Sequence, residues 1–438
     1  MDLSSLNELG QSAWADCLDL YQDTIFQLNR SIGSRIFHAQ TWLSAAIANE
    51  QACQNGFLDF NLSSPFIMIS DFPKLLRNSL AINRLSTMGF NNDEENHDHF
   101  PEWISAVDRK LLSRPFSALA DQLADIVVAK DGSGDYMTIC EGLEAAHKQR
   151  NGSKRFVIYV KKGVYEENVE IKKSMKNLVF IGDGIDETIV TGNKNVQDGS
   201  TTFRSATFAV SGDGFIARGI TFENTAGPEK HQAVALRSDS DFSVFYKCSF
   251  KGHQDTLYVH SQRQFYRDCD IYGTVDFIFG DALSVFQNCN IYLRRPLTGQ
   301  KNTVTAQGRK DPNENTAIVI HNSRIMASSE FGRVEGLYKS YLGRPWKEYS
   351  RTVIMKCWID GVIDPAGWAP WSGEFGLSTL YYGEYMNMGR GARVEGRVKW
   401  PGFHVIRSEA VAGSFSASRL LAGDEWIPAS GVPFTSGL

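Results

Sequence analysis

The sequence lacks the marks of several large protein classes. No run of about 18 apolar residues occurs among its 438 residues, so no membrane-spanning helix is predicted. The seven cysteines form no Cys-x-x-Cys pair and no Cys/His cluster with zinc spacing, so no metal site is expected. No Gly-x-Ser-x-Gly elbow, His-Glu-x-x-His helix or dinucleotide-binding glycine pattern is present, which argues against the enzymes built on those motifs.

Basic residues are scarce in the first quarter of the chain. Residues 1–112 carry 7 Lys and Arg against 14 Asp and Glu, a net charge of −7, while the remainder carries +2. The acidic N-terminal part could form ion pairs with the rest of the chain, or the rest of the chain could bind a polyanion. A net charge of +2 also arises from ordinary variation in composition. Residues 1–6 lack the basic start and apolar core of a signal peptide. Nothing in the charge pattern predicts a nucleic-acid partner.

One short pattern occurs three times in the middle of the chain. Its copies are Phe245–Phe250, Phe265–Ile271 and Phe286–Ile291. Their cysteines, Cys248, Cys269 and Cys289, are 21 and then 20 residues apart. A fixed period near 20 with alternating apolar residues indicates stacked coils of short strands. Equivalent positions of successive coils should then lie about 4.8 Å apart, as in any parallel ladder.

The same period aligns polar residues that could act together. Asp255 and Asp276 each lie seven residues after a repeat cysteine, so coils in register put the two carboxylates side by side. Gln254 precedes Asp255, and Gln232 lies 22 residues earlier, on the coil before. Two amides and two carboxylates on neighbouring rungs could form a catalytic site. They could equally form hydrogen-bonded ladders that only hold the coils together.

The chain divides into a helical front, a polar linker and a β-rich body. Residues 1–85 read as helical, because apolar residues such as Trp42 and Ala46 recur at helical spacing. Residues 86–115 form an acidic linker that contains Arg109, Lys110, Leu111 and Leu112, a dibasic site of the kind proteases cut. Residues 116–438 carry strand-like runs bounded by turns. Asn-x-Ser sequons occur at three places, Asn29, Asn61 and Asn151, and would carry glycans in a secreted protein.

Five blocks of the body resemble the plant pectin methylesterases, or pectinesterases. The blocks are Gly163–Glu167, Gln232–Leu236, Gln254–Leu257, Gly273–Gly280 and Leu342–Trp346. The resemblance implies an all-β, right-handed parallel β-helix, in agreement with the repeat. It also implies hydrolysis of methyl esters on homogalacturonan to pectate and methanol, without metal or cofactor. The expected partners are methyl-esterified homogalacturonan and a proteinaceous pectinesterase inhibitor, and the protein is expected to be a monomer secreted to the cell wall.

The front of the chain is similar to the inhibitor-like pro-region of that family, an α-helical bundle. Asp16–Leu18 and Thr41–Ala46 carry this likeness, and Arg109–Leu112 resembles the basic motif cut by a subtilisin-like processing protease. The family's signal peptide and first helical segment, with its own cysteine pair, have no counterpart here. We therefore expect an incomplete bundle.

The resemblance assigns a role to each residue of the predicted site. Asp276 would be the nucleophile, and Asp255 would protonate the departing methanol and then activate water. Gln254 and Gln232 would donate hydrogen bonds to the oxyanion, and Arg344 would orient Asp276 by a forked contact.

Other residues complete the implied assignment. Trp346 and Thr225 would join Gln232 and Arg344 in binding the sugar chain. A disulfide is expected between Cys269 and Cys289, because equivalent rungs lie within disulfide range and the family favours this pair over Cys248. Asp281 stands where the family usually has an uncharged Asn.

Two other functions compete with ester hydrolysis. Two carboxylates about 5 Å apart also suit a retaining glycosidase, so a polygalacturonase-like enzyme that cleaves glycans is the closest rival. A non-catalytic pectin-binding or inhibitor protein is the second, although it would be expected to have a damaged site. Methanol release from methylated pectin, compared with reducing ends formed from pectate, separates the three.

Overall fold

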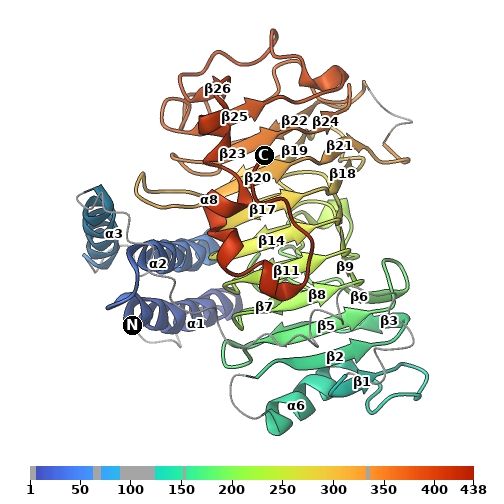
Figure 1. Ribbon diagram of the computed structural model, residues 1–438. Coiled ribbons are helices and arrows are strands. Elements are labelled where there is room, and N and C mark those ends of the chain that lie inside the picture. Colours follow the sequence, from blue (N-terminus) through green and yellow to red (C-terminus); the bar gives the residue numbers. More distant parts are fainter. Residues whose placement is uncertain (1–5, 63–70, 89–123, 151–153, 332–335) are drawn as a thin grey trace.

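We describe residues 6–62, 71–88, 124–150, 154–331 and 336–438 of a computed structural model (Figure 1). The body of the molecule is a parallel β-helix, as predicted. Its strands form three sheets of 11, 8 and 7 strands, in which every strand pairs in parallel with the next coil. In Figure 1 the coils stack from β1 at one end to β26 at the other.

Each sheet collects one strand from nearly every coil. The 11-stranded sheet contains β1 (Ile126–Val128), β2 (Phe156–Val160), β5 (Leu178–Gly182), β8 (Ile216–Arg218), β11 (Ser243–Tyr246), β14 (Arg263–Arg267), β17 (Leu283–Gln287), β20 (Ala317–His321), β23 (Arg351–Met355), β25 (Tyr381–Tyr385) and β26 (Phe403–Val405). The 8-stranded sheet contains β3 (Gly163–Glu166), β6 (Thr188–Gly192), β9 (Thr221–Asn224), β12 (Ser249–Lys251), β15 (Asp270–Gly273), β18 (Asn290–Leu293), β21 (Arg324–Ala327) and β24 (Trp358–Ile359). The 7-stranded sheet contains β4 (Val169–Ile171), β7 (Phe208–Val210), β10 (Leu236–Ser238), β13 (Leu257–Val259), β16 (Ile278–Gly280), β19 (Asn302–Gln307) and β22 (Ser340–Gly343).

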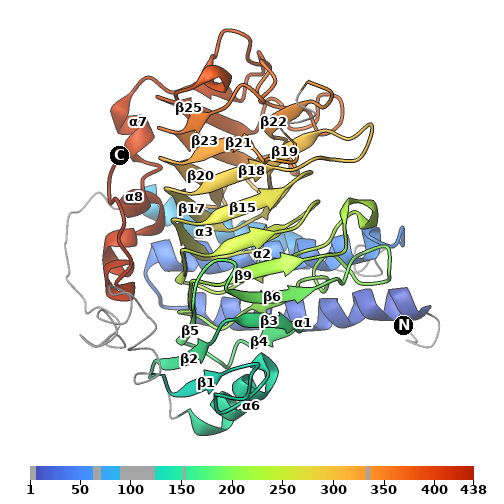
Figure 2. The same ribbon diagram turned by 90° about the vertical axis from the view of Figure 1, so that its right-hand side faces the viewer.

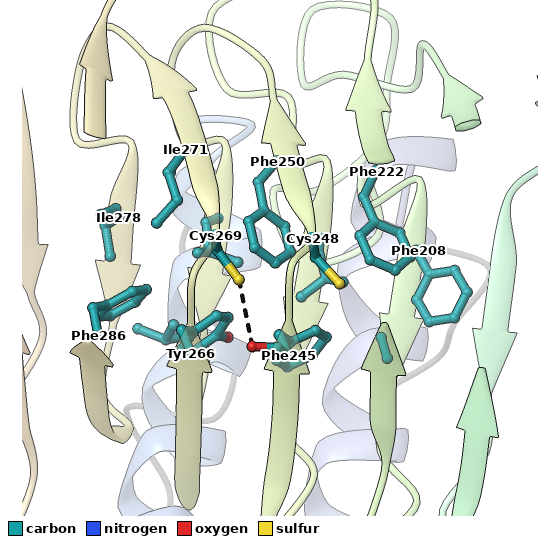
Figure 3. Close-up of a cluster of buried hydrophobic side chains, with 14 of the residues drawn as sticks. Phe208, Phe222, Phe245, Cys248, Phe250, Tyr266, Cys269, Ile271, Ile278 and Phe286 are labelled. Atoms are coloured by element: carbon teal, nitrogen blue, oxygen red, sulfur yellow. Dashed lines mark hydrogen bonds between the residues drawn. The ribbon is translucent and has the colours of Figure 1, made fainter. Parts of the chain in front are cut away.

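The repeat found in the sequence sets the register of these coils. Phe245 pairs with Tyr266, and Tyr266 pairs with Phe286, so each copy lies directly beside the next. Their rings stack with centroids 4.8 Å and 4.4 Å apart, nearly parallel (Figure 3). All three rings are buried in the interior of the β-helix. Stacked aromatic rings add packing energy to the hydrophobic burial, so the repeat is the core of the fold.

The predicted disulfide between Cys269 and Cys289 is wrong, since both thiols are free and buried. In-register rungs hold parallel side chains about 4.8 Å apart, whereas a disulfide needs Cβ atoms about 3.8 Å apart. Each thiol instead donates to a backbone carbonyl. Cys269 Sγ lies 3.4 Å from the oxygen of Phe245 (Figure 3). Cys289 Sγ lies 3.4 Å from the oxygen of Gln287. The repeat cysteines therefore serve as small buried side chains.

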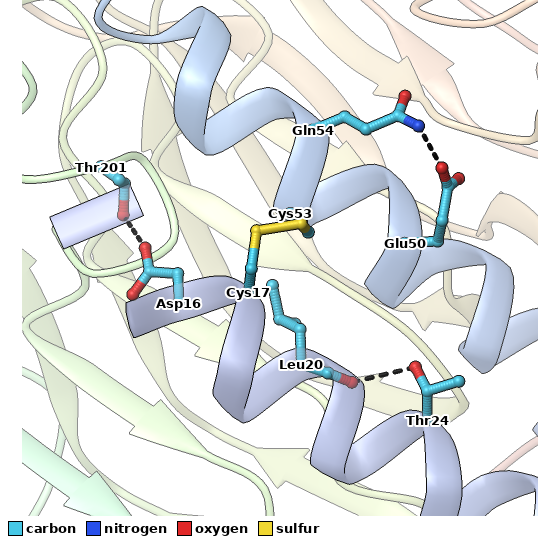
Figure 4. Close-up of a disulfide and its surroundings, with 8 residues drawn as sticks. All are labelled: Asp16, Cys17, Leu20, Thr24, Glu50, Cys53, Gln54 and Thr201. Atoms are coloured by element: carbon cyan, nitrogen blue, oxygen red, sulfur yellow. Dashed lines mark hydrogen bonds between the residues drawn. A yellow bond between two sulfur atoms is a disulfide. The ribbon is translucent and has the colours of Figure 1, made fainter. Parts of the chain in front are cut away.

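Three helices lie beside the β-helix, and we call them the helical region. They are α1 (Glu8–Ser31), α2 (Ile36–Leu58) and α3 (Phe72–Met88). The buried side of α1 carries Ala13, Cys17 and Leu20, a spacing that keeps apolar residues on one face. Figures 1 and 2 both place α1 and α2 against one side of the stacked strands. The structure contains a disulfide that was not predicted, Cys17–Cys53, which joins α1 to α2 (Figure 4).

Short helices and 3₁₀ turns lie at the first coil, along the 11-stranded sheet and in the connections between strands. They are α6 (Ile139–Gln149), α7 (Glu409–Gly413) and α8 (Ala417–Leu421), with the 3₁₀ turns η2 (Pro228–Lys230), η4 (Arg390–Ala392), η5 (Gly423–Glu425) and η6 (Pro428–Ser430). Helix α6 starts with a capping box between Thr138 and Glu141 and packs on β1 and β2 at the first coil. The segment with α7 and α8 runs over the 11-stranded sheet, where Trp426 is buried (Figure 2).

Helix α3 ends at Met88, and the first strand begins at Ile126. The predicted linker and processing motif, Arg109–Leu112, fall outside the described residues. Among the residues that the structure describes, no helix is long and apolar enough to cross a membrane.

Candidate active site

The two predicted carboxylates lie on equivalent turns of neighbouring coils. Asp255 lies between β12 and β13, and Asp276 lies between β15 and β16. Leu257 of β13 pairs with Ile278 of β16, so the aspartates two residues earlier occupy successive rungs. Both have a left-handed backbone, with φ of 62° for Asp255 and 51° for Asp276. Such backbones are uncommon for non-glycine residues and concentrate at functional sites.

Arg344 makes a forked contact with Asp276. Its Nε donates to Oδ1 at 2.8 Å and its Nη2 donates to Oδ2 at 2.6 Å. Thr303 of β19 adds a third side-chain donor, because its hydroxyl lies 2.6 Å from Oδ1 of Asp276 and also accepts the Asp276 amide at 2.8 Å. Charge-assisted hydrogen bonds of this kind stabilise the ionised carboxylate. Thr303 was not predicted, since it lies outside the five blocks.

Asp255 has a different environment from Asp276. Its side chain is buried and has no ion-pair partner among the described residues. Burial, then the neighbouring charges of Asp276 and Asp59, raise the pKa of Asp255 well above its usual range, while Arg344 lowers it by less. The two adjacent carboxyl groups thus differ in their surroundings: Asp276 is paired with a cation, and burial favours the protonated form of Asp255.

The two glutamines stand next to this pair. Gln232 and Gln254 form a parallel β-bridge across neighbouring coils, which aligns them as the sequence predicted. Both side chains line the same cleft as Asp255 and Asp276, and their amides have no hydrogen-bond partner in the described part of the chain. Side-chain N–H groups that are not already hydrogen-bonded can donate to an oxyanion that forms beside them and stabilise its negative charge.

The cleft around these groups has a volume of about 600 Å³ and aromatic walls. Tyr258 stacks on Phe279 with ring centroids 4.3 Å apart, and Trp346 meets Phe279 edge-on. Trp371, which the sequence analysis missed, also lines the cleft and lies under the Arg344 guanidinium at 4.3 Å. Thr225, predicted to bind the sugar, is exposed at the end of β9 and does not line the cleft.

Asp281, the departure from the family pattern, points away from the cleft. Its carboxylate accepts hydrogen bonds from Gln307 and Thr316 at 3.0 Å and 2.5 Å. Burial raises the pKa of Asp281 to about 6, although these hydrogen bonds and Arg309 oppose the rise. The Asp281 carboxyl therefore belongs to a buried polar network, separate from Asp255 and Asp276.

The helical region closes one side of the cleft. Asn55, Asp59 and Asn61, at and after the end of α2, line it together with the catalytic residues. The Asp59 carboxylate accepts the backbone N–H of Thr202 at 2.8 Å. Burial raises the pKa of Asp59 to about 6. Substrate could not enter this side without contacting α2.

Apolar packing and ion pairs fix the helices in this position. Alanines, cysteines and Phe57 of α1 and α2 form one buried cluster with Tyr258 and Phe279 of the cleft. Asp16 pairs with Arg204 at 2.6 Å and hydrogen-bonds Thr201 (Figure 4).

A second polar anchor joins the far end of α1 to the β-helix. Arg30 contacts Asp241 at 3.1 Å, and Trp42 donates to the same carboxylate at 2.9 Å. Asp241 is buried and also paired with Arg263. Within the described ranges, no group of three His, Cys, Asp or Glu side chains could hold a metal ion.

Comparison with known proteins identifies the family of both parts. The profile of the pectinesterase family matches residues 125–424, and that of the plant invertase/pectin methylesterase inhibitor family matches residues 2–82. Probable pectinesterase/pectinesterase inhibitor 6 of Arabidopsis thaliana is 55% identical over 99% of this chain and 83% of its own. Pectinesterase 2 of Citrus sinensis is 52% identical over 99% and 83%.

Solved structures agree with the sequence relatives. Pectin methylesterase from carrot superposes with a TM-score of 0.71 at 57% identity, over 72% of this chain and 98% of its own. A pectin methylesterase in complex with a hexasaccharide superposes with a TM-score of 0.56 at 27% identity, over 72% and 99%. With its β-helix, its paired aspartates and these relatives, the chain belongs to the pectinesterase family.

Proposed function

We propose that this pectinesterase hydrolyses methyl esters of homogalacturonan through an acyl-enzyme on Asp276. The forked contact between Arg344 and Asp276, beside an unpaired and buried Asp255, carries the proposal. This arrangement provides a charged nucleophile and a neutral proton donor within one pair of carboxyl groups, and the proposed ester hydrolysis uses both. A relative solved with a hexasaccharide supports a sugar chain as ligand.

The reaction then proceeds in two balanced halves. The Asp276 carboxylate attacks the ester carbonyl at C6, and the amides of Gln232 and Gln254 donate to the oxyanion. Collapse breaks the bond to the methoxy group, which takes the proton of Asp255 and leaves as methanol. Asp255, now ionised, removes a proton from water, and the resulting hydroxide breaks the anhydride. The products are a uronic acid and a free Asp276 carboxylate, and Asp255 again holds its proton.

Two product assays test this reaction. Methyl-esterified pectin should release methanol, whereas unmethylated pectate should give no new reducing ends. Reducing ends without methanol would instead favour the glycan-cleaving alternative, for which neighbouring carboxylates are also suited. Neither product would favour a non-catalytic binding protein. The Asp276→Asn chain serves as the matched control for both assays, because it keeps the shape of the site.

We also infer that the helical region inhibits its own catalytic part. Asn55, Asp59 and Asn61 occupy one side of the cleft, and the buried cluster holds α1 and α2 against its aromatic wall. Cleavage near Arg109–Leu112 by a subtilisin-like protease would let the helices leave. The site of action would be the plant cell wall, where the substrate lies, and separate pectinesterase inhibitor proteins would bind the same cleft.

The test compares the full chain with residues 124–438. The solved carrot chain corresponds to this part alone, so the part is expected to fold without the helices. The shorter chain should release methanol at least about tenfold faster at limiting substrate, because access to the cleft no longer requires the helices to dissociate. Equal rates would contradict self-inhibition while leaving the esterase proposal intact.

A further inference from the structure

Thr303 lies directly behind Asp276 in the stacked coils. Ile278 of β16 pairs with Thr305 of β19, so Asp276 and Thr303, each two residues earlier, occupy the same position on successive rungs. Thr303 is 2% exposed and is not one of the described residues that line the cleft. It contacts Asp276 through two hydrogen bonds, so it can influence the reaction through that carboxylate without touching the substrate.

The hydroxyl proton of Thr303 has a fixed direction. The Asp276 amide lies 2.8 Å from the hydroxyl oxygen, and a backbone N–H can only donate. The one hydroxyl proton is therefore left for Oδ1 of Asp276, at 2.6 Å. Asp255 has the same left-handed backbone, but its amide donates to the backbone carbonyl of Val275 at 3.0 Å. The amide of Asp276 thus differs from that of Asp255 in having a side-chain hydroxyl as its acceptor.

The donors around Asp276 are shared unequally between its two oxygens. A carboxylate offers about four lone-pair sites, two on each oxygen. Oδ1 accepts from Thr303 and from Nε of Arg344, at 2.6 Å and 2.8 Å, so both of its sites are filled. Oδ2 accepts from Nη2 of Arg344 at 2.6 Å and has no second donor among the described residues. The lone pair that remains free belongs to Oδ2.

We propose that Thr303 is a positioning residue that fills Oδ1 of Asp276 and thereby makes Oδ2 the oxygen that attacks the ester carbon. The use of Asp276 as a nucleophile rests on the proposed function. A lone pair of Oδ2 forms the new C–O bond, the methoxy group leaves with the proton of Asp255, and Oδ1 becomes the carbonyl oxygen of the anhydride. The hydroxyl and the Arg344 fork together prevent rotation of the carboxylate, so the free lone pair keeps one direction.

Methanol release by the full chain tests the role of the hydroxyl. Thr303→Val keeps the size of the side chain and removes the hydroxyl. Its kcat should fall about 10- to 100-fold, the effect expected from one hydrogen bond to a charged group. KM should change little, because Thr303 does not line the cleft. Thr303→Ser keeps the hydroxyl and should recover most of the lost kcat.

Thr188 provides a matched control on another coil. It is buried on β6, accepts the Asp183 amide at 3.0 Å and donates to the backbone carbonyl of Val160 at 3.1 Å. Thr188→Val therefore removes the same pair of hydrogen bonds, with a neutral acceptor in place of the carboxylate. Its thermal transition should fall about as far as that of Thr303→Val, while its kcat should equal that of the wild type. All these chains carry the helical region, so access to the cleft is the same in each.

The bound substrate tests the choice of oxygen, whether or not Thr303→Val folds. In a crystal structure of the Asp255→Asn chain with a methylated oligogalacturonate, the ester carbon should lie nearer to Oδ2 than to Oδ1 of Asp276. An ester carbon nearer to Oδ1 would overturn the proposal.

The kinetic outcomes separate this inference from the esterase proposal. If the wild type releases methanol and folded Thr303→Val has the same kcat, or Thr303→Ser is as slow as Thr303→Val, the role of Thr303 is wrong and the esterase proposal stands. A raised KM at unchanged kcat would have the same meaning. A wild type that releases no methanol would contradict the esterase proposal, and the assignment of Oδ2 would fall with it.

Discussion

Asp255 and Asp276 have the same backbone, nearly the same burial and different partners. Arg344 and Thr303 give Asp276 three short side-chain contacts, whereas Asp255 has none from a cation. Burial and the charge of Asp276 raise the pKa of Asp255, whereas the forked contact with Arg344 pairs Asp276 with a cation. The proposed division of roles between nucleophile and acid rests on the partners of each carboxyl, not on its position in the fold.

Exchange of each aspartate for asparagine should therefore give different defects. Asp276→Asn removes the nucleophile, so no covalent uronyl adduct should form. Asp255→Asn keeps the nucleophile but loses the proton donor and the base, so both steps should slow, by about 10²–10⁴-fold. Mass spectrometry of the protein after brief mixing with methylated oligogalacturonate distinguishes the two. An adduct on the Asp276→Asn chain would rule out this assignment.

Arg344 should influence both the rate and its dependence on pH. Arg344→Leu removes the cation that stabilises the ionised Asp276, so the barrier should rise by about 3 kcal/mol, or about 100-fold in rate. Arg344 also lowers the pKa of Asp255, so its removal should let Asp255 keep its proton to higher pH, and the basic limb of the rate profile should move upward in pH. Profiles of kcat/KM from pH 4 to 9 provide the measurement, with the exposed Arg393→Leu as control. An unmoved limb would contradict the role of Arg344.

The sequence predicted most of this site because its residues occur in blocks with a fixed period. Asp255, Asp276 and the two glutamines lie where the repeat and the resemblance placed them. Thr303 and Trp371 were missed, since each reaches the cleft from a later coil and lies outside any recognisable block. Thr225 was placed in the sugar site by analogy, and its exposed position just after β9 does not follow from any pattern in the sequence.

At the scale of the elements, the cysteines show that the register of neighbouring strands does not by itself predict a disulfide. The 20- and 21-residue spacing correctly predicted that Cys248, Cys269 and Cys289 stack. The bond predicted between Cys269 and Cys289 is wrong, because parallel side chains on a ladder keep their Cβ atoms too far apart. The observed bond joins Cys17 and Cys53, which lie on two helices. Recognising that pair from the sequence would require knowing how α1 packs on α2.

The end of α2 should make docking of the helices depend on pH. Burial raises the pKa of Asp59 to about 6, so the docked state holds a proton that the undocked state releases near pH 4. Docking should therefore be strongest below about pH 4 and lose up to about 3 kcal/mol as the pH rises to 6. His38 acts in the opposite sense, because burial and Arg263 lower its pKa to about 4.

Comparison of variants separates these two contributions. The difference in docking free energy between wild type and Asp59→Asn should grow between pH 4 and 6, measured as binding of the separated helical region to residues 124–438. His38→Gln should change the same curve with the reverse sign. Parallel curves for wild type and Asp59→Asn would show that Asp59 does not titrate on docking.

On the scale of the whole molecule, the main feature that the sequence did not predict is how the two parts meet. The net charge of −7 in residues 1–112 against +2 in the rest allowed for internal pairing. The structure contains such pairs in Asp16–Arg204 and Asp23–Lys173, yet another pair, Arg30–Asp241, has the reverse polarity. Net charge can indicate that two parts attract each other. It cannot give the position of α1 and α2 on the β-helix, which depends on shape and apolar contacts.

The polar anchors should determine whether the helices stay after the linker is cut. Arg30, near the C-terminal end of α1, forms ion pairs with Asp213 and Asp241 of the β-helix. Arg204 of the β-helix pairs with Asp16 in the first half of α1. Each change of Arg30→Met and Arg204→Met leaves a buried aspartate with one cation fewer, which costs about 1–3 kcal/mol. A chain cut by protease within residues 89–123 should elute from gel filtration as one complex when it is wild type, and as two separate parts when it carries both changes. Methanol release should rise in the same samples.

The control is the exposed Arg390→Met, which should leave the complex intact. A double variant that also stays intact would show that the apolar cluster alone holds the helices on the cleft.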